Sequence, residues 1–118
     1  MNKHLSYILM ICLIAGCSTV PSTQYRSVSY NPAVVSLIDE AFLLSEQGHL
    51  ALAQSKIERA LRIEPKNPAL WLELAYNHER QQDNSGALNM AKRARSYASD
   101  RAMLTRINTL VGRLSESH

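Results

Sequence analysis

The chain has 118 residues and carries 13 lysine and arginine side chains against 10 aspartates and glutamates, a net charge of +3. This excess is too small for a nucleic-acid-binding surface, and its one dense cluster is Lys92, Arg93 and Arg95. We interpret that cluster as a solvated helix face, with contact to an acidic partner or an anionic surface as the alternative. Of the two cysteines, Cys12 lies in an N-terminal apolar run that we expect to be removed, so no internal disulfide is predicted.

The first sixteen residues have the layout of an export signal. Lys3 and His4 precede a largely apolar run from Leu5 to Ile14. A helix that spans a bilayer needs about 20 apolar residues, whereas the apolar region of a signal peptide needs roughly 7–15. Residues 1–16 are therefore predicted to be a cleaved signal peptide rather than a permanent anchor.

The signal ends in the run Leu13-Ile14-Ala15-Gly16-Cys17, which resembles a bacterial lipobox. The resemblance implies that Cys17 carries a covalent lipid, a diacylglycerol and an N-acyl chain, and becomes the first residue of the mature protein. The alternative is an ordinary secretory signal in which the cysteine is coincidental. Removing residues 1–16 takes away one lysine and no acid, which leaves a net charge of +2.

The segment from Ser18 to Tyr30 reads STVPSTQYRSVSY and has no apolar period that defines a buried face. Such a segment buries too little apolar surface to offset the entropy of folding. We therefore predict three regions: a signal peptide at 1–16, the lipidated cysteine with a flexible tether at 17–30, and a helical domain at 31–118.

From Asn31 onward, apolar residues recur at helical spacing, which predicts an all-α domain of five antiparallel helices. Asn31 and Asn67 each precede a proline, a pattern typical of an N-cap followed by the first turn. Gly48 is predicted to end the first helix. The expected helices cover about 31–47, 49–63, 67–82, a segment to about 97 after a capping turn at 83–86, and about 100–114, where residue 99 or 100 is the cap. No strand pattern competes with them.

The sequence also repeats itself at an offset of 34 residues, which aligns Leu37 with Trp71, Ala41 with Ala75 and Ala53 with Ala87. A 34-residue period built from two helices resembles the tetratricopeptide repeat, in which small residues lie where paired helices cross. The resemblance covers residues 32–99 and implies a right-handed solenoid fragment of two helix pairs, with the fifth helix as a C-terminal cap. Gln82 departs from it, standing where the first unit has Gly48. The alternative is an unrelated five-helix bundle.

Catalytic chemistry has little support in the sequence. His49, His78 and His118 are scattered, no HExxH pattern or phosphate-binding glycine loop is present, and no cysteine lies near a histidine for a metal site. We interpret the histidines as turn, packing or solvent residues, and the acidic pair Asp39-Glu40 as an exposed feature of a helix. The chain is predicted not to be an enzyme and to need no metal or cofactor besides the lipid.

Binding is the remaining function, and tetratricopeptide arrays bind protein segments on the concave face lined by the first helix of each pair. The resemblance implies that Ser45 and Ala69 are groove positions and that Met103 and Leu110 of the fifth helix extend the groove. A clamp for a C-terminal carboxylate is not expected, because the face is mainly apolar. The alternative is that Phe42 and Tyr76 pack against the tether or the capping helix, and we expect Trp71 to lie in the core. The predicted partner-binding groove consists of Val35, Ile38, Phe42, Leu72, Tyr76, Glu79, Arg80, Arg106 and Arg113.

The complete layout of lipobox, short tether and small repeat domain resembles the activator lipoproteins of class A penicillin-binding proteins in Gram-negative bacteria. The residues that carry this resemblance are 57–65, 67–68 and 70–75, much of which is ordinary repeat consensus. Serine at position 18, directly after the lipidated cysteine, implies transfer to the outer membrane rather than retention in the inner membrane. The expected function is a periplasmic protein-protein interaction module that activates a peptidoglycan synthase. The alternatives are a pilotin-like assembly or secretion adaptor and an enzyme accessory protein with weak catalysis of its own.

Overall fold

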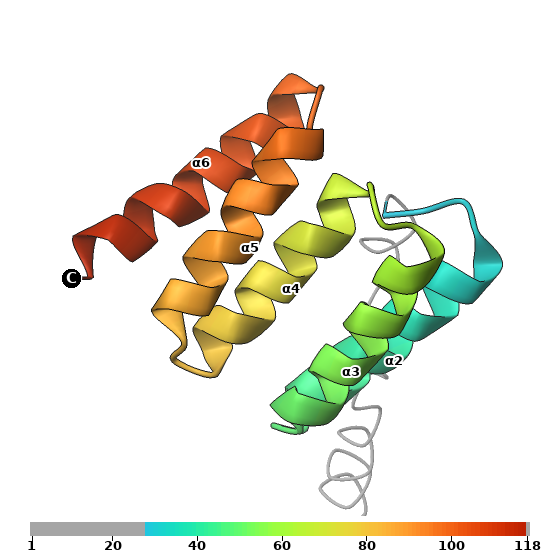
Figure 1. The fold of residues 1–118 in the computed structure, drawn as a ribbon. Helices are drawn as coiled ribbons and strands as arrows, with labels where there is room; N and C mark the ends of the chain where they lie inside the picture. Colours follow the sequence, from blue (N-terminus) through green and yellow to red (C-terminus); the bar gives the residue numbers. More distant parts are fainter. Residues whose placement is uncertain (1–27, 118) are drawn as a thin grey trace, which may run out of the picture.

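The computed structural model describes residues 28–117, which form five α-helices without a strand (Figure 1). Turns of three or four residues join successive helices, so neighbouring helices run in opposite directions. The predicted all-α fold of five helices is confirmed. The predicted signal peptide, Cys17, the predicted tether as far as residue 27 and His118 lie outside the described residues. The helices are α2 (Pro32–Glu46), α3 (Leu50–Ile63), α4 (Pro68–Arg80), α5 (Asn84–Tyr97) and α6 (Arg101–Glu116).

Four of the helices begin with a side-chain cap. Asn31 Oδ1 accepts a hydrogen bond from Ala33 N at 3.0 Å, and the predicted caps Asn67, Asp83 and Asp100 do the same for their own helices at 2.8–2.9 Å. These bonds satisfy backbone N–H groups that have no partner within the helix. In α3 the N-cap position is His49, whose side chain makes no such bond.

The helices pack as two hairpins followed by a single helix. The first hairpin is α2 with α3 and the second is α4 with α5, and these pairs share the most extensive contacts. Figure 1 shows the helices following one another across the molecule from α2 to α6. The core has two clusters, one in the first hairpin and the start of α4 and one in α4, α5 and α6. Trp71, Met90 and Met103 contact both.

The second hairpin is held together by small residues. The buried residues of α5 are Ala87, Ala91 and Ala94, whose exposed fraction is 0 %. Alanine lets two helix backbones approach closely, as the 34-residue pattern predicts. α6 then covers the same cluster with Ile107, Leu110 and Leu114, the position expected of a capping helix. Across residues 28–117, none of the helices combines the length and apolar character that a bilayer-spanning segment needs.

The turns inside the two hairpins have the same backbone conformation although their residues differ. Gly48 has a φ of 80°, and Gln82, which lies 34 residues later, has a φ of 63°. Glycine adopts this left-handed region readily, whereas a residue with a Cβ atom is strained there. The second turn therefore has the same left-handed backbone conformation as the first, although a glutamine stands where the first turn has a glycine.

The start of the described chain packs onto the domain and corrects one predicted boundary. Val28 is buried in the first cluster, and its carbonyl accepts a hydrogen bond from Asn67 Nδ2 at 2.7 Å. Ser29 Oγ donates to Glu64 Oε1 at 2.6 Å. We predicted a tether through residue 30, but Val28 and Ser29 contact the domain, because Val28 supplies apolar surface that the α3–α4 turn covers, while Tyr30 is fully exposed.

Candidate functional site

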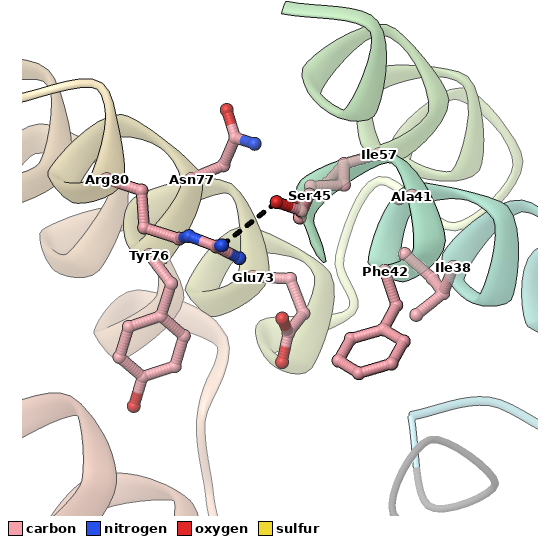
Figure 2. Close-up of a pocket in the computed structure, with 9 residues that line it drawn as sticks. All are labelled: Ile38, Ala41, Phe42, Ser45, Ile57, Glu73, Tyr76, Asn77 and Arg80. Carbon is pink, nitrogen blue, oxygen red and sulfur yellow. Dashed lines mark hydrogen bonds between the residues drawn. The ribbon is translucent and has the colours of Figure 1, made fainter. Parts of the chain in front are cut away.

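A pocket of about 50 Å³ opens between α2 and α4, with Ile57 of α3 contributing one wall. Figure 2 shows side chains from the two first helices of the hairpins facing each other across it. These helices are close because the first cluster joins α2 and α3 to the start of α4. The lining residues are Ile38, Ala41, Phe42, Ser45, Ile57, Glu73, Tyr76, Asn77 and Arg80.

Arg80 joins the two sides of the pocket at one end. Its Nη2 donates to the backbone oxygen of Ser45 at 2.9 Å, and its Nη1 lies 3.7 Å from a carboxylate oxygen of Glu46. About half of the Arg80 side chain is exposed, so the ion pair contributes little to stability. The hydrogen bond is the second one that the Ser45 carbonyl accepts, since Gly48 N also donates to it at 3.0 Å. Arg80 therefore links the end of α2 to the end of α4.

Glu73 places a carboxylate between Phe42 and Tyr76 (Figure 2). Burial raises the pKa of Glu73, and the nearby Arg106 partly counteracts this rise. The Nη2 atom of Arg106 lies 3.9 Å from Oε1 of Glu73, and only 21 % of the glutamate side chain is exposed. The pocket thus holds a poorly hydrated carboxylate beside two aromatic rings.

The groove prediction did not include Glu73, although a signal for it exists in the sequence. Ala69, Glu73, Tyr76 and Arg80 are spaced by three or four residues, so they share one side of α4. The predicted set instead contained Leu72, which the structure buries completely in the second cluster. That prediction is wrong for Leu72, because residue 72 lies on the side of α4 that faces α5 and α6.

α6 carries two of the predicted groove residues, Arg106 and Arg113, neither of which lines the pocket. Arg113 donates from Nε and Nη2 to the two carboxylate oxygens of Glu79 at 2.8 and 2.7 Å. This two-point contact raises the pKa of Arg113. Together with Arg106 beside Glu73, it shows that the predicted arginines of α6 lie against the acids of α4. Each of them already has an intramolecular partner.

The remaining predicted groove residues differ in how far their side chains are buried. Ile38 is 2 % exposed and lines the pocket, while Phe42 and Tyr76 are half-buried beside it. Val35 is half-buried and lies outside the lining. The three other positions are core residues: Ala69 and Leu110 are buried, and Met103 packs against both clusters. The predicted groove residues of α6 therefore lie outside the pocket lining.

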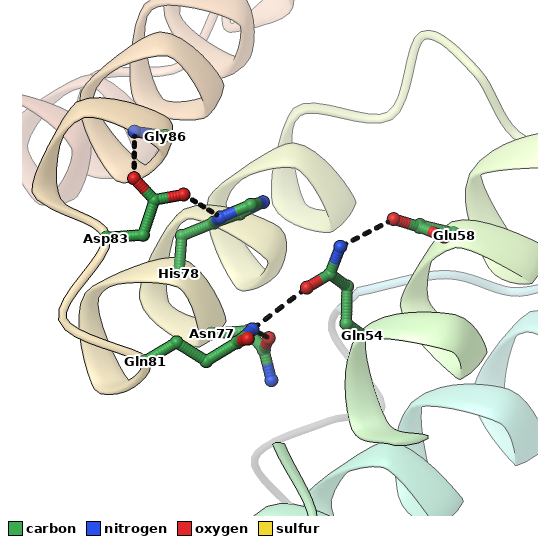
Figure 3. A network of polar contacts seen from close by, with 7 residues as sticks. All are labelled: Gln54, Glu58, Asn77, His78, Gln81, Asp83 and Gly86. Atoms are coloured by element: carbon green, nitrogen blue, oxygen red, sulfur yellow. Dashed lines mark hydrogen bonds and ion pairs between the residues drawn. The ribbon is translucent and has the colours of Figure 1, made fainter. Parts of the chain in front are cut away.

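A polar network lies next to the pocket (Figure 3). Asn77 is 3 % exposed; its Nδ2 donates to the carbonyl of Leu50 at 3.2 Å, and its Oδ1 accepts from Gln81 Nε2 at 2.6 Å. Gln81 also donates to Gln54 at 2.8 Å, and Gln54 donates to Glu58 at 2.8 Å. The network ties α4 to α3, so it fixes one wall of the pocket.

His78 has a structural role in the same region. Its Nδ1 lies 2.8 Å from Asp83 Oδ2, and the other Asp83 oxygen accepts from Gly86 N at 2.9 Å. The Gly86 N–H and the His78 side chain lower the pKa of Asp83. Among the described residues, no group of three or more His, Cys, Asp or Glu side chains is placed to hold a metal ion.

Trp71 lies between the core and the surface, on the side of α4 that faces α3 and α5. Its Nε1 donates to the carbonyl of Pro65 at 2.8 Å, and the Arg93 guanidinium carbon is 4.8 Å from its ring centroid. The ring contacts both core clusters, as predicted for a core residue, but it stays half-buried and is covered by an arginine. It also borders a shallow hollow lined by Glu58, Leu61, Arg62 and Leu74.

The pocket combines apolar side chains, a poorly hydrated carboxylate and the half-exposed guanidinium of Arg80 on adjacent helices. Comparison of the chain with models of protein families gives no match, and comparison with curated proteins gives none either.

Proposed function

We propose that this protein is a lipid-anchored periplasmic interaction module of the tetratricopeptide type, which binds a segment of a protein partner in the pocket between α2 and α4. The most specific form of the proposal is an activator of a class A penicillin-binding protein at the outer membrane. The observation that carries it is the pocket, because α2 and α4 present aromatic and charged side chains on one side of a stacked helical array.

The geometry supports binding of a chain segment more than binding of a small molecule. The enclosed volume is about 50 Å³, whereas pockets for small molecules usually enclose about 300–1,000 Å³. Apolar contacts at Phe42 and Tyr76 lie beside the charged groups of Glu73 and Arg80. A peptide that lies along the helices satisfies both kinds of contact, since its side chains alternate along an extended chain or share one face of a helix.

The anchor sets where such a partner has to lie. Ten residues separate Cys17 from Val28, the first residue that packs on the domain. Ten extended residues span at most about 36 Å. We therefore expect the partner segment to lie no farther from the membrane surface than the length of this extended segment plus the size of the domain.

The proposal is tested by crosslinking in intact cells that express the full chain. Phe42→Ala combined with Tyr76→Ala is expected to reduce capture of the penicillin-binding protein at least tenfold. Tyr97→Ala is the matched control, because this tyrosine is exposed on α5 and remote from the pocket lining. Circular dichroism shows whether both variants remain helical. Undiminished capture by the folded double variant contradicts the groove proposal, and capture of a secretin or pilus component instead supports the adaptor alternative.

The anchor is tested separately. Cys17→Ser is expected to move the protein from the membrane fraction to the soluble periplasm, because the thiol is the proposed lipid attachment point. Acyl labelling of the unmodified chain with an alkyne fatty acid provides the positive control. A variant that stays membrane-bound, together with an unlabelled native chain, contradicts lipidation.

A further inference from the structure

The first hairpin leaves an apolar surface on the side away from the core. Leu43 of α2 is 59 % exposed and Leu52 of α3 is 57 % exposed, and Ile63 at the end of α3 is also exposed. Most apolar side chains of α2 share the side that faces the core, but Leu43 does not. We define the outer face as Ser36, Glu40 and Leu43 of α2 with Leu52, Lys56, Arg59 and Ile63 of α3.

The residues of the outer face lie side by side in rows. Lys56 Nζ forms an ion pair with Glu40, which shows that these two residues lie at the same height on the two antiparallel helices. In that register Leu43 lies beside Leu52, one turn away from the ion pair. In the opposite direction Ser36 lies beside Arg59. Lys56 and Arg59 both lower the pKa of Glu40, which shows that the two cations are close to it.

Charges are separated across the outer face. The acid Glu40 and its neighbour Asp39 are on α2, whereas Lys56 and Arg59 are on α3. A two-fold axis that runs parallel to both helices, between two facing copies, places α2 of one copy over α3 of the other at the same height. Each Glu40 then faces Lys56 of the second copy, and each Leu43 faces Leu52 of the second copy. The face is complementary to itself, as an isologous interface requires.

The opposite end of the helical array differs, because a further helix covers the hairpin there. There α6 covers the second hairpin with Ile107, Leu110 and Leu114, while Thr105, Asn108 and Thr109 are exposed on α6. That end presents polar side chains to solvent. Among the described residues, no equivalent helix covers the leucines of the first hairpin.

We propose that the outer face is a homodimer interface, in which a second copy of this chain covers Leu43 and Leu52. α3 has 14 residues, so the face is about 21 Å long and two helices wide. A face about 21 Å long and about 20–24 Å wide covers roughly 420–500 Å², which is less than the roughly 600 Å² or more that specific interfaces bury per partner. The dimer is therefore weak in dilute solution and forms where the chains are concentrated. It leaves the pocket between α2 and α4 open, so the proposal is independent of the groove partner.

The first test places one reporter cysteine in each of two copies of the full chain. A copy with Leu43→Cys and a differently tagged copy with Leu52→Cys are expressed in the same cells and oxidised. The proposed axis predicts a disulfide-linked heterodimer. The control pair carries Tyr97→Cys in one copy and Leu52→Cys in the other, and it is expected to crosslink at least five times less. Equal yields in the two pairs, or no heterodimer, overturn the proposal.

The second test uses charge exchange to separate contacts between copies from contacts within one copy. Glu40→Lys or Lys56→Glu alone places like charges opposite each other in a homodimer, so each variant is expected to lose most of the reporter crosslink. Mixing a Glu40→Lys copy with a Lys56→Glu copy restores opposite charges between the copies, while the pair within each copy stays broken. Recovery of at least half the native yield supports the two-fold arrangement. Failure to recover, with both variants helical by circular dichroism, overturns it.

Discussion

The first hairpin exposes Leu43 and Leu52, whereas the second hairpin is covered by α6 and buries its alanines completely. Both hairpins have an asparagine N-cap before a proline, and both turns contain a residue with positive φ. The two hairpins therefore form with the same caps and turns although their outer surfaces differ. The comparison teaches that the helix pair forms from local signals, while its stability depends on what covers its open side. The predictions below compare covered with exposed positions and equivalent positions of the two hairpins.

The largest difference is expected between the covered and the exposed leucines. Leu110→Ala removes a side chain that is 1 % exposed and is expected to lower the free energy of unfolding by about 2–5 kcal/mol. Leu43→Ala is expected to change it by less than about 0.5 kcal/mol, because this side chain is already in solvent. Urea denaturation at low protein concentration measures both values. A large loss for Leu43→Ala under these conditions means that another part of the chain covers it.

The two asparagine caps are expected to differ by about twofold. Asn31→Ala removes one capping bond and is expected to cost about 1 kcal/mol. Asn67→Ala removes the same cap and also the bonds from Nδ2 to Val28 O and to Glu64, so about 2 kcal/mol is expected. Chemical denaturation of both variants provides the comparison. Equal costs contradict a contribution from the contact with Val28.

The two turns are expected to respond in opposite directions. Gln82→Gly relieves a left-handed backbone strain and is expected to stabilise the protein by up to about 1 kcal/mol. Gly48→Gln introduces that strain at the equivalent turn and is expected to destabilise it by about 1 kcal/mol. Thermal unfolding gives the sign of each change. A destabilising Gln82→Gly points to a contact of the glutamine side chain that outweighs the strain.

The smallest effect concerns Glu73 and its equivalent in the first hairpin, Asp39. Burial raises the pKa of Glu73 in the folded state above its usual value of about 4.5, so the folded state binds this proton more tightly than the unfolded state. Stability linked to Glu73 therefore increases as pH falls through the folded pKa toward 4.5. Glu73→Gln is expected to raise the Tm slightly at pH 7, and the difference from the native chain shrinks near pH 4.5.

Asp39→Asn is the control for this comparison, because Asp39 is exposed on α2. It is expected to leave the Tm nearly unchanged at pH 7. Differential scanning calorimetry between pH 4.5 and pH 7 measures both variants. A lower Tm for Glu73→Gln at pH 7 shows that the ion pair with Arg106 outweighs the cost of burying the carboxylate.

The helices were predictable because their signals are local. Asn31, Asn67 and Asp100 are caps whose effect depends on residues two or three positions away, so their consequences can be read along the chain. The buried alanines of α5 were also predictable, since the 34-residue repeat aligns Ala87 with Ala53. These features involve short-range chemistry or strict periodicity.

The groove was predicted less accurately because it depends on which side of each helix faces its neighbours. Leu72 and Glu73 are adjacent in sequence, yet one is fully buried and the other lines the pocket. A rotation of α4 by one residue, about 100°, exchanges their roles. The end of the predicted tether was missed for a related reason. Val28 is buried in the first cluster, and its carbonyl accepts a hydrogen bond from Asn67, 39 residues away, so no local sequence pattern predicts this contact.

The attachment of Val28 has a mechanical consequence. Pulling on the N-terminal segment does not first load α2, because the hydrogen bonds from Asn67 to Val28 and from Ser29 to Glu64 lie before it along the chain. A load applied there is passed to the α3–α4 turn, between the two hairpins. The first turn of α2 therefore does not unwind until these two hydrogen bonds break. The domain bears the applied force at the turn between its two hairpins rather than at its first helix.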